Sequence, residues 1–333
     1  MPPPSAKRSA ATPYADLAPD VVIAAVERAG FRADGRVLAL NSYENRVYQV
    51  GVEDSTPVVV KFYRPGRWSR AALLEEHAFA LELAAAEIPV IAPLVLNGQT
   101  LLEHEGYSYA MYPRRGGRWP DLDQHDDRMW MGRFLGRMHR VGAVRPFEHR
   151  RALGVDWLAE EPAAYLLDSD WLPDYQIDRY RDVTEALIDR IRAAFEAAGP
   201  LRRLRIHGDC HRGNVLWTDS GPHFVDLDDC MTGPAIQDLW MLLAGSREER
   251  QGQMRDLLEG YDQFGDFDRV ELGLIEPLRA LRMIHYAAWL ARRWTDPAFP
   301  LAFPWFGAPR YWEEHVRQLT EQLEALDEPP LRV

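Results

Sequence analysis

The stretch that decides the fold is Ile206–Trp217, which reads IHGDCHRGNVLW, together with Phe224–Asp229, which reads FVDLDD. Apolar runs flank both polar clusters, so two short strands are predicted to present an Asp, an Asn and a second Asp at their ends. Phosphoryl transfer needs one carboxylate at the attacking hydroxyl, and an amide oxygen and a second carboxylate that hold Mg²⁺ against the phosphates. The pattern therefore predicts a phosphoryl-transfer site.

Upstream of this stretch the sequence predicts a small β-rich region. Runs of β-branched and apolar residues alternate with turn-forming residues, which is typical of an antiparallel meander, and one helix lies on each side of it. The predicted strands are Val37–Leu40, Val47–Val50 and Val58–Tyr63, with two more near Val95–Leu96 and Tyr107–Tyr112; the predicted helices are Pro19–Gly30 and Arg70–Glu87.

Beyond a Pro- and Gly-containing break at Pro113–Gly117 the pattern is mostly helical. A small β-rich lobe joined to a larger helical lobe predicts a bilobal α+β fold with the active site in a cleft. We expect a flexible tail at 1–14, a nucleotide-binding lobe at 15–112 and a catalytic lobe at 113–333. The predicted helices of the second lobe are Gln124–Arg140, Ala152–Leu166, Arg181–Ala198, Arg247–Tyr261, Val270–Arg293 and Pro309–Leu326.

The composition excludes several classes of protein. A formal charge of −12 over 333 residues argues against nucleic acid or an anionic membrane as partner, because both require a basic surface. Two cysteines cannot form a disulfide framework, which favours a reducing compartment. The sequence shows neither a membrane-spanning run nor an apolar leader. We therefore expect a cytoplasmic protein.

The order of several separate motifs carries a family resemblance. His207-Gly208-Asp209-x-His211-x-x-Asn214, followed by Asp226, resembles the catalytic loop of the aminoglycoside phosphotransferase and choline kinase superfamily. Over nearly the whole chain the sequence is more similar to the bacterial stress response kinase A family of Ser/Thr protein kinases. The strings that carry this second resemblance are Asn41–Tyr48, Val60–Pro65, Gly233–Trp240, Phe303–Trp305 and Glu328–Leu331.

The resemblance implies roles for individual residues of the catalytic loop. Asp209 matches the catalytic Asp, which faces the acceptor hydroxyl. Asn214 matches the Asn that ligates magnesium, and Asp226 matches the metal-binding Asp of the kinase Asp-Phe-Gly motif. The implied cofactor is Mg²⁺, and ATP is the implied co-substrate.

The resemblance also implies a nucleotide site in the β-rich lobe. Ser42 lies in the turn that covers the ATP phosphates, and Lys61 matches the lysine that contacts the α- and β-phosphates. Its helical partner is Glu75 or Glu76; we choose Glu76, because the family places this Glu thirteen residues before the Pro that is Pro89 here. Met111 and Tyr112 are placed like the hinge that meets adenine.

The implied activity is a Ser/Thr protein kinase of a bacterial stress response, with autophosphorylation. A small-molecule kinase on the same fold is the alternative, because only Cys230–Gly233 separate Asp229 from Pro234, which leaves no room for a peptide-binding activation segment. A non-catalytic nucleotide-binding module is disfavoured by the complete set of site residues. A metal hydrolase is more distant, although His207 and His211 suggest zinc.

For the other polar residues near the loop we expect structural roles. His207 is expected to bond backbone and orient the loop, and Asp238 to accept backbone N–H groups. Cys210 and Cys230 are expected to be small buried residues rather than a redox pair. Asp228 and Asp229 lack the Gly and distal Glu of a calcium-binding loop.

Overall fold

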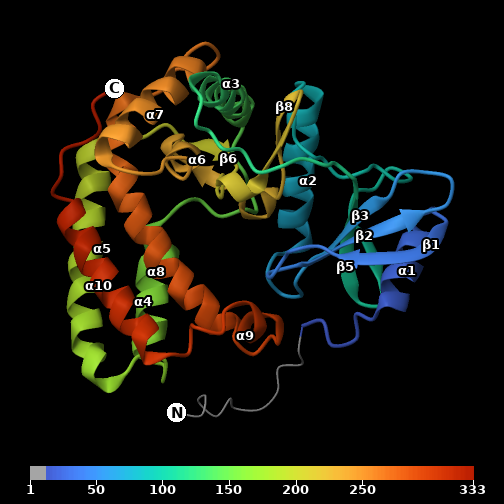
Figure 1. The fold of residues 1–333 in the computed structure, drawn as a ribbon, viewed down its shortest axis with the longest axis horizontal. Helices are drawn as coiled ribbons and strands as arrows, with labels where there is room; N and C mark the ends of the chain where they lie inside the picture. Colours follow the sequence, from blue (N-terminus) through green and yellow to red (C-terminus); the bar gives the residue numbers. More distant parts are fainter. Residues whose placement is uncertain (1–12) are drawn as a thin grey trace. The chain divides into compact units, whose positions relative to one another are not determined.

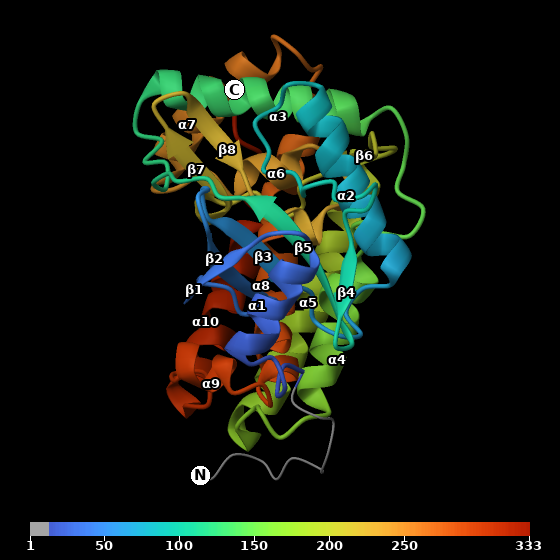
Figure 2. The same ribbon diagram turned by 90° about the vertical axis from the view of Figure 1, so that its right-hand side faces the viewer.

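The computed structural model describes residues 13–333, and the part of the predicted tail at 1–12 lies outside this range. The described chain forms two compact units (Figures 1 and 2). The sheet-containing unit comprises Pro13–Arg151 and Arg203–Phe267, and the helical unit comprises Ala152–Arg202 and Asp268–Val333. This division differs from the expected lobes 15–112 and 113–333, which remain a prediction.

A five-stranded antiparallel sheet forms the first part of the sheet-containing unit. Its strand order is β1-β2-β3-β5-β4, which confirms the predicted meander of the first three strands. Helix α1 (Pro19–Arg28) packs on the sheet, and α2 (Arg70–Ala85) follows β3 (Figure 2). The strands are β1 (Ala33–Ala39), β2 (Arg46–Val52), β3 (Val58–Phe62), β4 (Leu102–His104) and β5 (Tyr107–Pro113).

One predicted strand lies elsewhere. Leu96 forms only an isolated bridge with Gln99, whereas β4 begins at Leu102. Glu105 and Gly106 both have positive φ, at 47° and 81°. Two such residues give a hairpin turn whose twist matches the strands, so the chain reverses there and β4 pairs with β5.

Tyr14 belongs to the core of the sheet. It is 9% exposed, and its ring stacks on Tyr107 with centroids 6.1 Å apart. Its hydroxyl donates to the backbone oxygen of Phe62 at 3.3 Å, and the Arg46 guanidinium lies 4.4 Å from its ring centroid. The ordered packing of this unit therefore starts before Ala15, the first residue of the expected lobe.

Two helices of the sheet-containing unit pack closely through glycine. On α3 (His125–Gly142), a Cβ at Gly132 would lie 1.9 Å from the backbone oxygen of Leu257 in α7 (Arg247–Tyr261), and a Cβ at Gly260 would lie 2.2 Å from that of Met129. The backbones of α3 and α7 are therefore in contact at these glycines, so no larger side chain fits at Gly132 or Gly260.

Short strands carry the predicted polar stretch. β6 (Leu204–Ile206) pairs with β9 (Met231–Gly233), and β7 (Val215–Thr218) pairs with β8 (Gly221–Phe224). Helix α6 (Ile236–Trp240) follows β9. The residues between Asp229 and Pro234 are thus held as a strand rather than as a loop.

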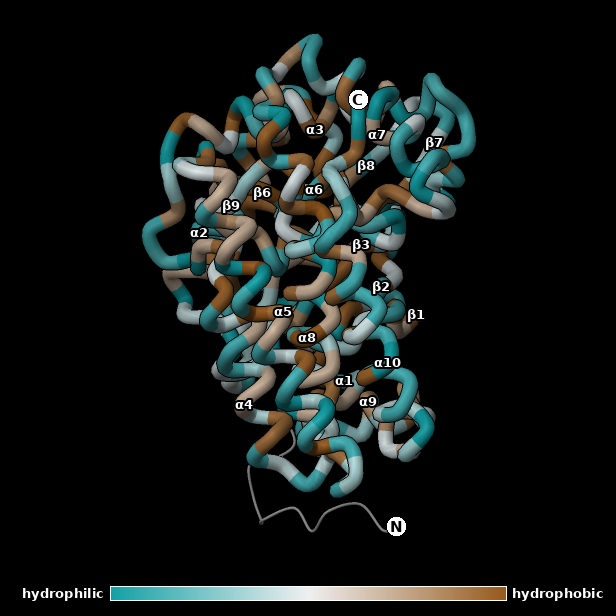
Figure 3. Tube along the Cα trace, turned by 90° about the vertical axis from the view of Figure 1, so that its left-hand side faces the viewer, coloured by the Kyte–Doolittle hydropathy of each residue, from teal (hydrophilic) through white to brown (hydrophobic). Residues whose placement is uncertain are grey.

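The helical unit consists of α4 (Glu161–Leu167), α5 (Ile177–Ala198), α8 (Ile275–Arg293), α9 (Ala298–Ala302) and α10 (Pro309–Ala325). Apolar and polar residues alternate along these helices (Figure 3), and the apolar faces meet around aromatic rings such as Trp171, Phe306 and Trp312. A π-helical turn at Asp156–Glu160 precedes α4. Among residues 13–333, every helix is too short or too polar to cross a membrane.

Candidate active site

A cavity of about 310 Å³ in the sheet-containing unit brings together most of the predicted site residues. Apolar side chains from segments far apart in the sequence line it, including Leu40, Val59 and Leu216. Such a volume with a few convergent polar groups is typical of a small-ligand site. The predicted residues that line it are Ser42, Lys61, Glu76, Tyr112, Asn214 and Asp226.

The loop that carries Asp209 is fixed by Asp238 of α6. The two carboxylate oxygens of Asp238 accept the backbone N–H groups of His207 and Gly208, at 2.7 and 2.8 Å. His207 Nε2 donates to the backbone oxygen of Val225 at 2.9 Å, which ties the loop to the segment before Asp226. Both expected structural roles are confirmed.

Gly208 is required by close packing. Its φ is 84°, and a Cβ there would lie 2.2 Å from the backbone oxygen of Asp229. An L side chain is disfavoured at this φ and has no space here. The Arg that protein kinases carry before the catalytic Asp therefore does not fit in this chain.

Asp209 and Asn214 lie side by side. The Asn214 side-chain nitrogen donates to the backbone oxygen of Asp209 at 2.9 Å and lies 3.4 Å from its carboxylate. The amide nitrogen is thereby committed to Asp209, so the amide oxygen is the atom suited to a cation. His211 Nε2 lies 3.4 Å from the Asp209 carboxylate, while its Nδ1 accepts from Gly213.

Asp226 adopts a backbone conformation that few residues other than glycine adopt. Its φ and ψ are 59° and 62°, in the left-handed region. The side chain is half-exposed, and Oδ1 accepts a hydrogen bond from Lys61 Nζ at 2.8 Å. Strained residues of this kind cluster at functional sites, which fits a carboxylate aimed into the cavity.

The two neighbouring glutamates of α2 have different partners. Glu76 is buried, and its Oε1 lies 3.6 Å from Lys61 Nζ. Glu75 points to the loop after α3, where its carboxylate accepts backbone N–H groups of residues 148–150 at 2.7 to 2.9 Å. The geometry supports the choice of Glu76 as the partner of Lys61.

Lys61 is the cationic centre of the site. Burial would lower its pKa, but the carboxylates of Asp226, Asp228 and Glu76 outweigh burial and hold the pKa well above its usual value. Burial raises the pKa of Glu76 to about 7, against the opposing effect of Lys61. The lysine is therefore charged at any physiological pH, as a phosphate ligand must be.

Asp228, which had no predicted ligand role, connects several parts of the site. It is buried, lies 3.3 Å from Lys61 Nζ, and accepts from Asn45 Nδ2 at 3.0 Å and from Arg67. Asn45 belongs to the turn that also contains Ser42. The Ser42 hydroxyl donates to the backbone oxygen of Asn45 at 3.2 Å. Asp228 thus anchors the turn expected over the phosphates.

Tyr112 and Met111 face different surroundings. Tyr112 lines the cavity and hydrogen-bonds Tyr63 at 2.9 Å. Met111 is fully buried in the core of the sheet, and its backbone oxygen accepts from Leu94 at 2.7 Å. The structure does not bring the Met111 side chain into the cavity, because alternate residues of β5 point to opposite faces of the sheet.

The two cysteines and the residues around His207 complete the site. Both cysteines are buried and free, as expected. Within residues 13–333, the one group of metal-type ligands is His125, Asp256 and Glu259, so the zinc reading of the His207 region gains no support. The Asp256 carboxylate is already paired with Arg128 at 2.6 Å.

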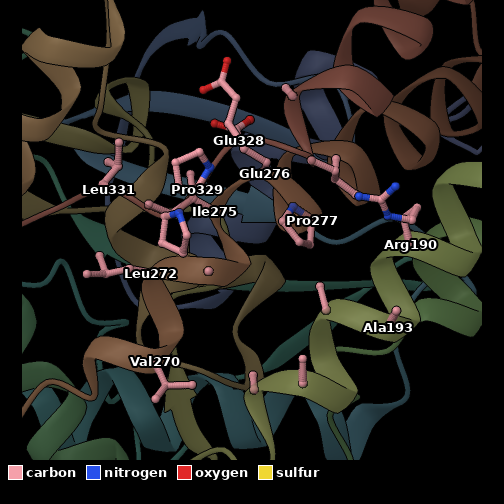
Figure 4. Close-up of a pocket in the computed structure, with 17 residues that line it drawn as sticks. Arg190, Ala193, Val270, Leu272, Ile275, Glu276, Pro277, Glu328, Pro329 and Leu331 are labelled. Carbon is pink, nitrogen blue, oxygen red and sulfur yellow. The ribbon is translucent and has the colours of Figure 1, made fainter.

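A larger cavity, of about 410 Å³, lies in the helical unit (Figure 4). Alanines of α5 and prolines of the C-terminal segment line much of it, as Ala193 and Pro329 do in Figure 4. Its charged residues have protein partners: Arg190 pairs with Asp327, and Glu276 accepts from Gln322 at 2.9 Å. None of the predicted site residues lines this cavity.

The fold and the site define a class of protein. Residues 36–272 match the family described as "Phosphotransferase enzyme family", and the chain belongs to that family. It is an ATP-dependent phosphotransferase with the bilobal α+β kinase fold. Amicoumacin kinase in complex with AMP-PNP, Ca²⁺ and Ami shares that fold, with a TM-score of 0.71 and 19% identity over 94% of this chain and 95% of the other.

Within this class the chain is similar to bacterial stress response kinases. It is 47% identical over 320 residues to "Stress response kinase A" of Salmonella choleraesuis, which covers 96% of this chain and 97% of the relative. It is equally similar, with the same coverage, to "Serine/threonine protein kinase RdoA" of Salmonella typhimurium. The predicted resemblance is confirmed.

Proposed function

We propose that this kinase transfers the γ-phosphate of Mg·ATP to Ser or Thr hydroxyls of proteins in a bacterial stress response in the cytoplasm, and that it phosphorylates itself. The observation that carries the phosphate-donor side is the convergence of Lys61, Asn214 and Asp226 on one cavity, beside Asp209. The protein acceptor rests on the similarity to the Ser/Thr protein kinase of Salmonella typhimurium.

The donor set fits a magnesium ion. The Asn214 amide oxygen and the Asp226 carboxylate are hard oxygen ligands on one cavity wall, as Mg²⁺ prefers. When bound, the ion would offset the charge of the β- and γ-phosphates. Lys61 would hold the α- and β-phosphates, with Glu76 keeping the ammonium group in place.

Asp209 would act on the acceptor. Its carboxylate is partly exposed, so a hydroxyl can approach it and give up its proton as the new bond to phosphorus forms. Asn214, through its bond to the Asp209 backbone oxygen, fixes the distance between the acceptor side and the metal side. Tyr112 would adjoin the adenine, which the apolar walls of the cavity would sandwich.

A small-molecule acceptor is the second candidate. The segment after Asp229 is a three-residue strand paired with β6, and it offers no extended platform for a peptide. The solved amicoumacin kinase, which has the same fold, is a complex with AMP-PNP, Ca²⁺ and Ami. This comparison shows only the fold, so it leaves the protein acceptor as the first proposal.

The test is phosphoryl transfer from labelled ATP by purified protein, with Asp209→Asn as the inactive partner. Label on the wild-type chain, and on an Asp209→Asn chain mixed with it, would support a protein acceptor and self-phosphorylation between copies. Mapping by mass spectrometry should place the label on Ser or Thr. Rapid ATP turnover with a hydroxyl metabolite, and none with any protein, would contradict it.

A further inference from the structure

Arg150 is a buried cation that sequence reasoning did not single out. It follows α3, its side chain is 0% exposed, and its guanidinium lies 4.2 Å from the Trp68 ring centroid. A buried guanidinium is costly unless each of its donors finds a partner. Its partners therefore show what the residue holds together.

Those partners belong to two segments of the site. On one side, Nη1 donates to the Ala72 backbone oxygen of α2 at 3.2 Å and lies 3.6 Å from Glu76 Oε2. On the other side, Nε donates to the Cys230 backbone oxygen at 2.6 Å, and Nη2 donates to that of Asp228. One side chain thus joins α2 to the segment that follows Asp226.

The loop that presents Arg150 is fixed to both segments as well. Glu75 of α2 accepts the N–H groups of residues 148–150, including that of Arg150 at 2.9 Å. The Arg151 backbone oxygen accepts from Thr232 of β9 at 3.1 Å. The cation is therefore held in place before any nucleotide arrives.

Glu76 is shared between two cations. Its Oε1 faces Lys61 and its Oε2 faces Arg150, both at 3.6 Å. With the guanidinium in place, the carboxylate has one oxygen directed at Lys61. Without it, the side-chain bonds that join α2 to residues 228–230 are lost, and nothing else in these contacts fixes the second oxygen.

We propose that Arg150 is a positioning residue that holds Glu76 against Lys61 and so keeps the kinase in its active arrangement without phosphorylation. In protein kinases the lysine–glutamate pair must be assembled, and phosphorylation of an activation segment controls this step. Here β9 leaves no such segment, and Arg150 makes the link with constitutive bonds. The inference rests on the proposed nucleotide site.

The test is a double-mutant cycle of Arg150→Met with Glu76→Gln, measured as kcat and as KM for ATP. Because it acts through Glu76, Arg150→Met should lower kcat/KM by about tenfold in the wild type, no more than Glu76→Gln does, and by no more than about twofold in Glu76→Gln. Arg150→Lys, which keeps the charge, should recover part of the loss. An equal loss in both backgrounds would overturn the proposal.

Arg205 supplies the matched control. It is also buried, it pairs with another glutamate of α2, Glu82, at 2.7 Å, and its guanidinium lies 4.6 Å from the Phe79 ring centroid. Arg205→Met should lower the melting temperature as Arg150→Met does, with a change in kcat of less than about threefold. Equal losses of kcat in the two variants would show a purely structural role for Arg150.

Hydrogen exchange tests the same link without activity. Arg150→Met should increase amide exchange in α2 and in residues 228–230, which its guanidinium contacts. Arg205→Met should leave 228–230 unchanged, because Arg205 pairs with Thr232 of β9 and not with these residues. Unaltered exchange at 228–230 in Arg150→Met would overturn the proposal even if the wild type proved inactive. Inactivity of the wild type itself would instead contradict the proposed function.

Discussion

Two cavities in the described part of this protein, one in each unit, differ in what lines them. The smaller, of about 310 Å³, has Lys61, Glu76 and Asp226 on its wall, and two of these three are buried. The larger, of about 410 Å³, is lined mainly by alanine, leucine, isoleucine and proline, and its charges are paired with neighbours. Burying charged groups is costly even when they are paired, so such a cluster marks function better than cavity volume does.

The largest effect should come from Asp209, which lies beside the smaller cavity through its hydrogen bond with Asn214. Asp209→Asn removes the carboxylate and keeps its shape, so turnover should fall by about 10² to 10⁴. The control is Asp219→Asn, an exposed residue with the same change of charge, which should stay within about twofold of wild type. Initial rates with labelled ATP measure both. Similar losses of turnover in the two variants would contradict the catalytic role of Asp209.

The lysine and the two glutamates test the donor side. Lys61→Met should lower kcat/KM for ATP by about 10- to 100-fold, and Glu76→Gln should lower it less, because the lysine itself contacts the phosphates. Glu75→Gln should have the smallest effect, since Glu75 holds backbone rather than Lys61. If Glu75→Gln is damaging and Glu76→Gln is silent, the assigned partner is wrong.

Stability should respond to Tyr14 more than to an exposed tyrosine of the helical unit. Tyr14→Ala removes a ring that is 9% exposed, and we expect a loss of about 3 kcal/mol in the free energy of unfolding. Tyr175 is 61% exposed, and Tyr175→Ala should cost less than about 0.5 kcal/mol. Urea denaturation compares them. Equal urea midpoints for the two variants would show that Tyr14 does not pack in the core of the sheet.

Each unit contains a buried neutral histidine. Burial, and then Lys61 and Arg150, lower the pKa of His77 from 6.5 to about 3. Between these values the unfolded chain binds the proton and the folded chain does not, so stability is full above pH 6.5 and falls as the pH drops toward 3.

His77→Gln should therefore reduce the loss of stability between pH 7.5 and pH 5 by about 2 kcal/mol. Burial lowers the pKa of His315 in the helical unit to about 4. His315→Gln should therefore reduce the loss of stability between the same two pH values by a similar amount. Urea midpoints at the two pH values give the comparison. An unchanged pH dependence in His77→Gln would mean that this histidine is protonated in the folded state.

Motif order made much of the site predictable from the sequence. The polar stretch around Asp209, the meander and Lys61 are local patterns, and the structure has them where they were expected. The β4–β5 hairpin had a readable signal at Glu105-Gly106 that the prediction did not use. Such local signals predict the structure correctly because turns and strand ends are determined by residues nearby in the sequence.

The charged network behind the site could not be predicted in the same way. Arg67 contacts Asp228 from a residue 161 positions earlier, and Arg150 contacts its backbone from 78 positions earlier. No spacing rule connects such residues, because the fold alone brings them together. Met111 and Tyr112 are neighbours in sequence, but the pleat of β5 sends only one of them to the cavity.

The most direct test of the account is the magnesium dependence of ATP binding, measured by titration calorimetry. Mg²⁺ should tighten ATP binding to the wild type by about tenfold, and Asp226→Asn should remove most of that gain, because it removes a metal ligand. Asp229→Asn, three residues away and outside the cavity lining, should keep the gain. An Asp226→Asn protein that binds ATP with the full magnesium gain would contradict the assignment of this cavity as the Mg·ATP site.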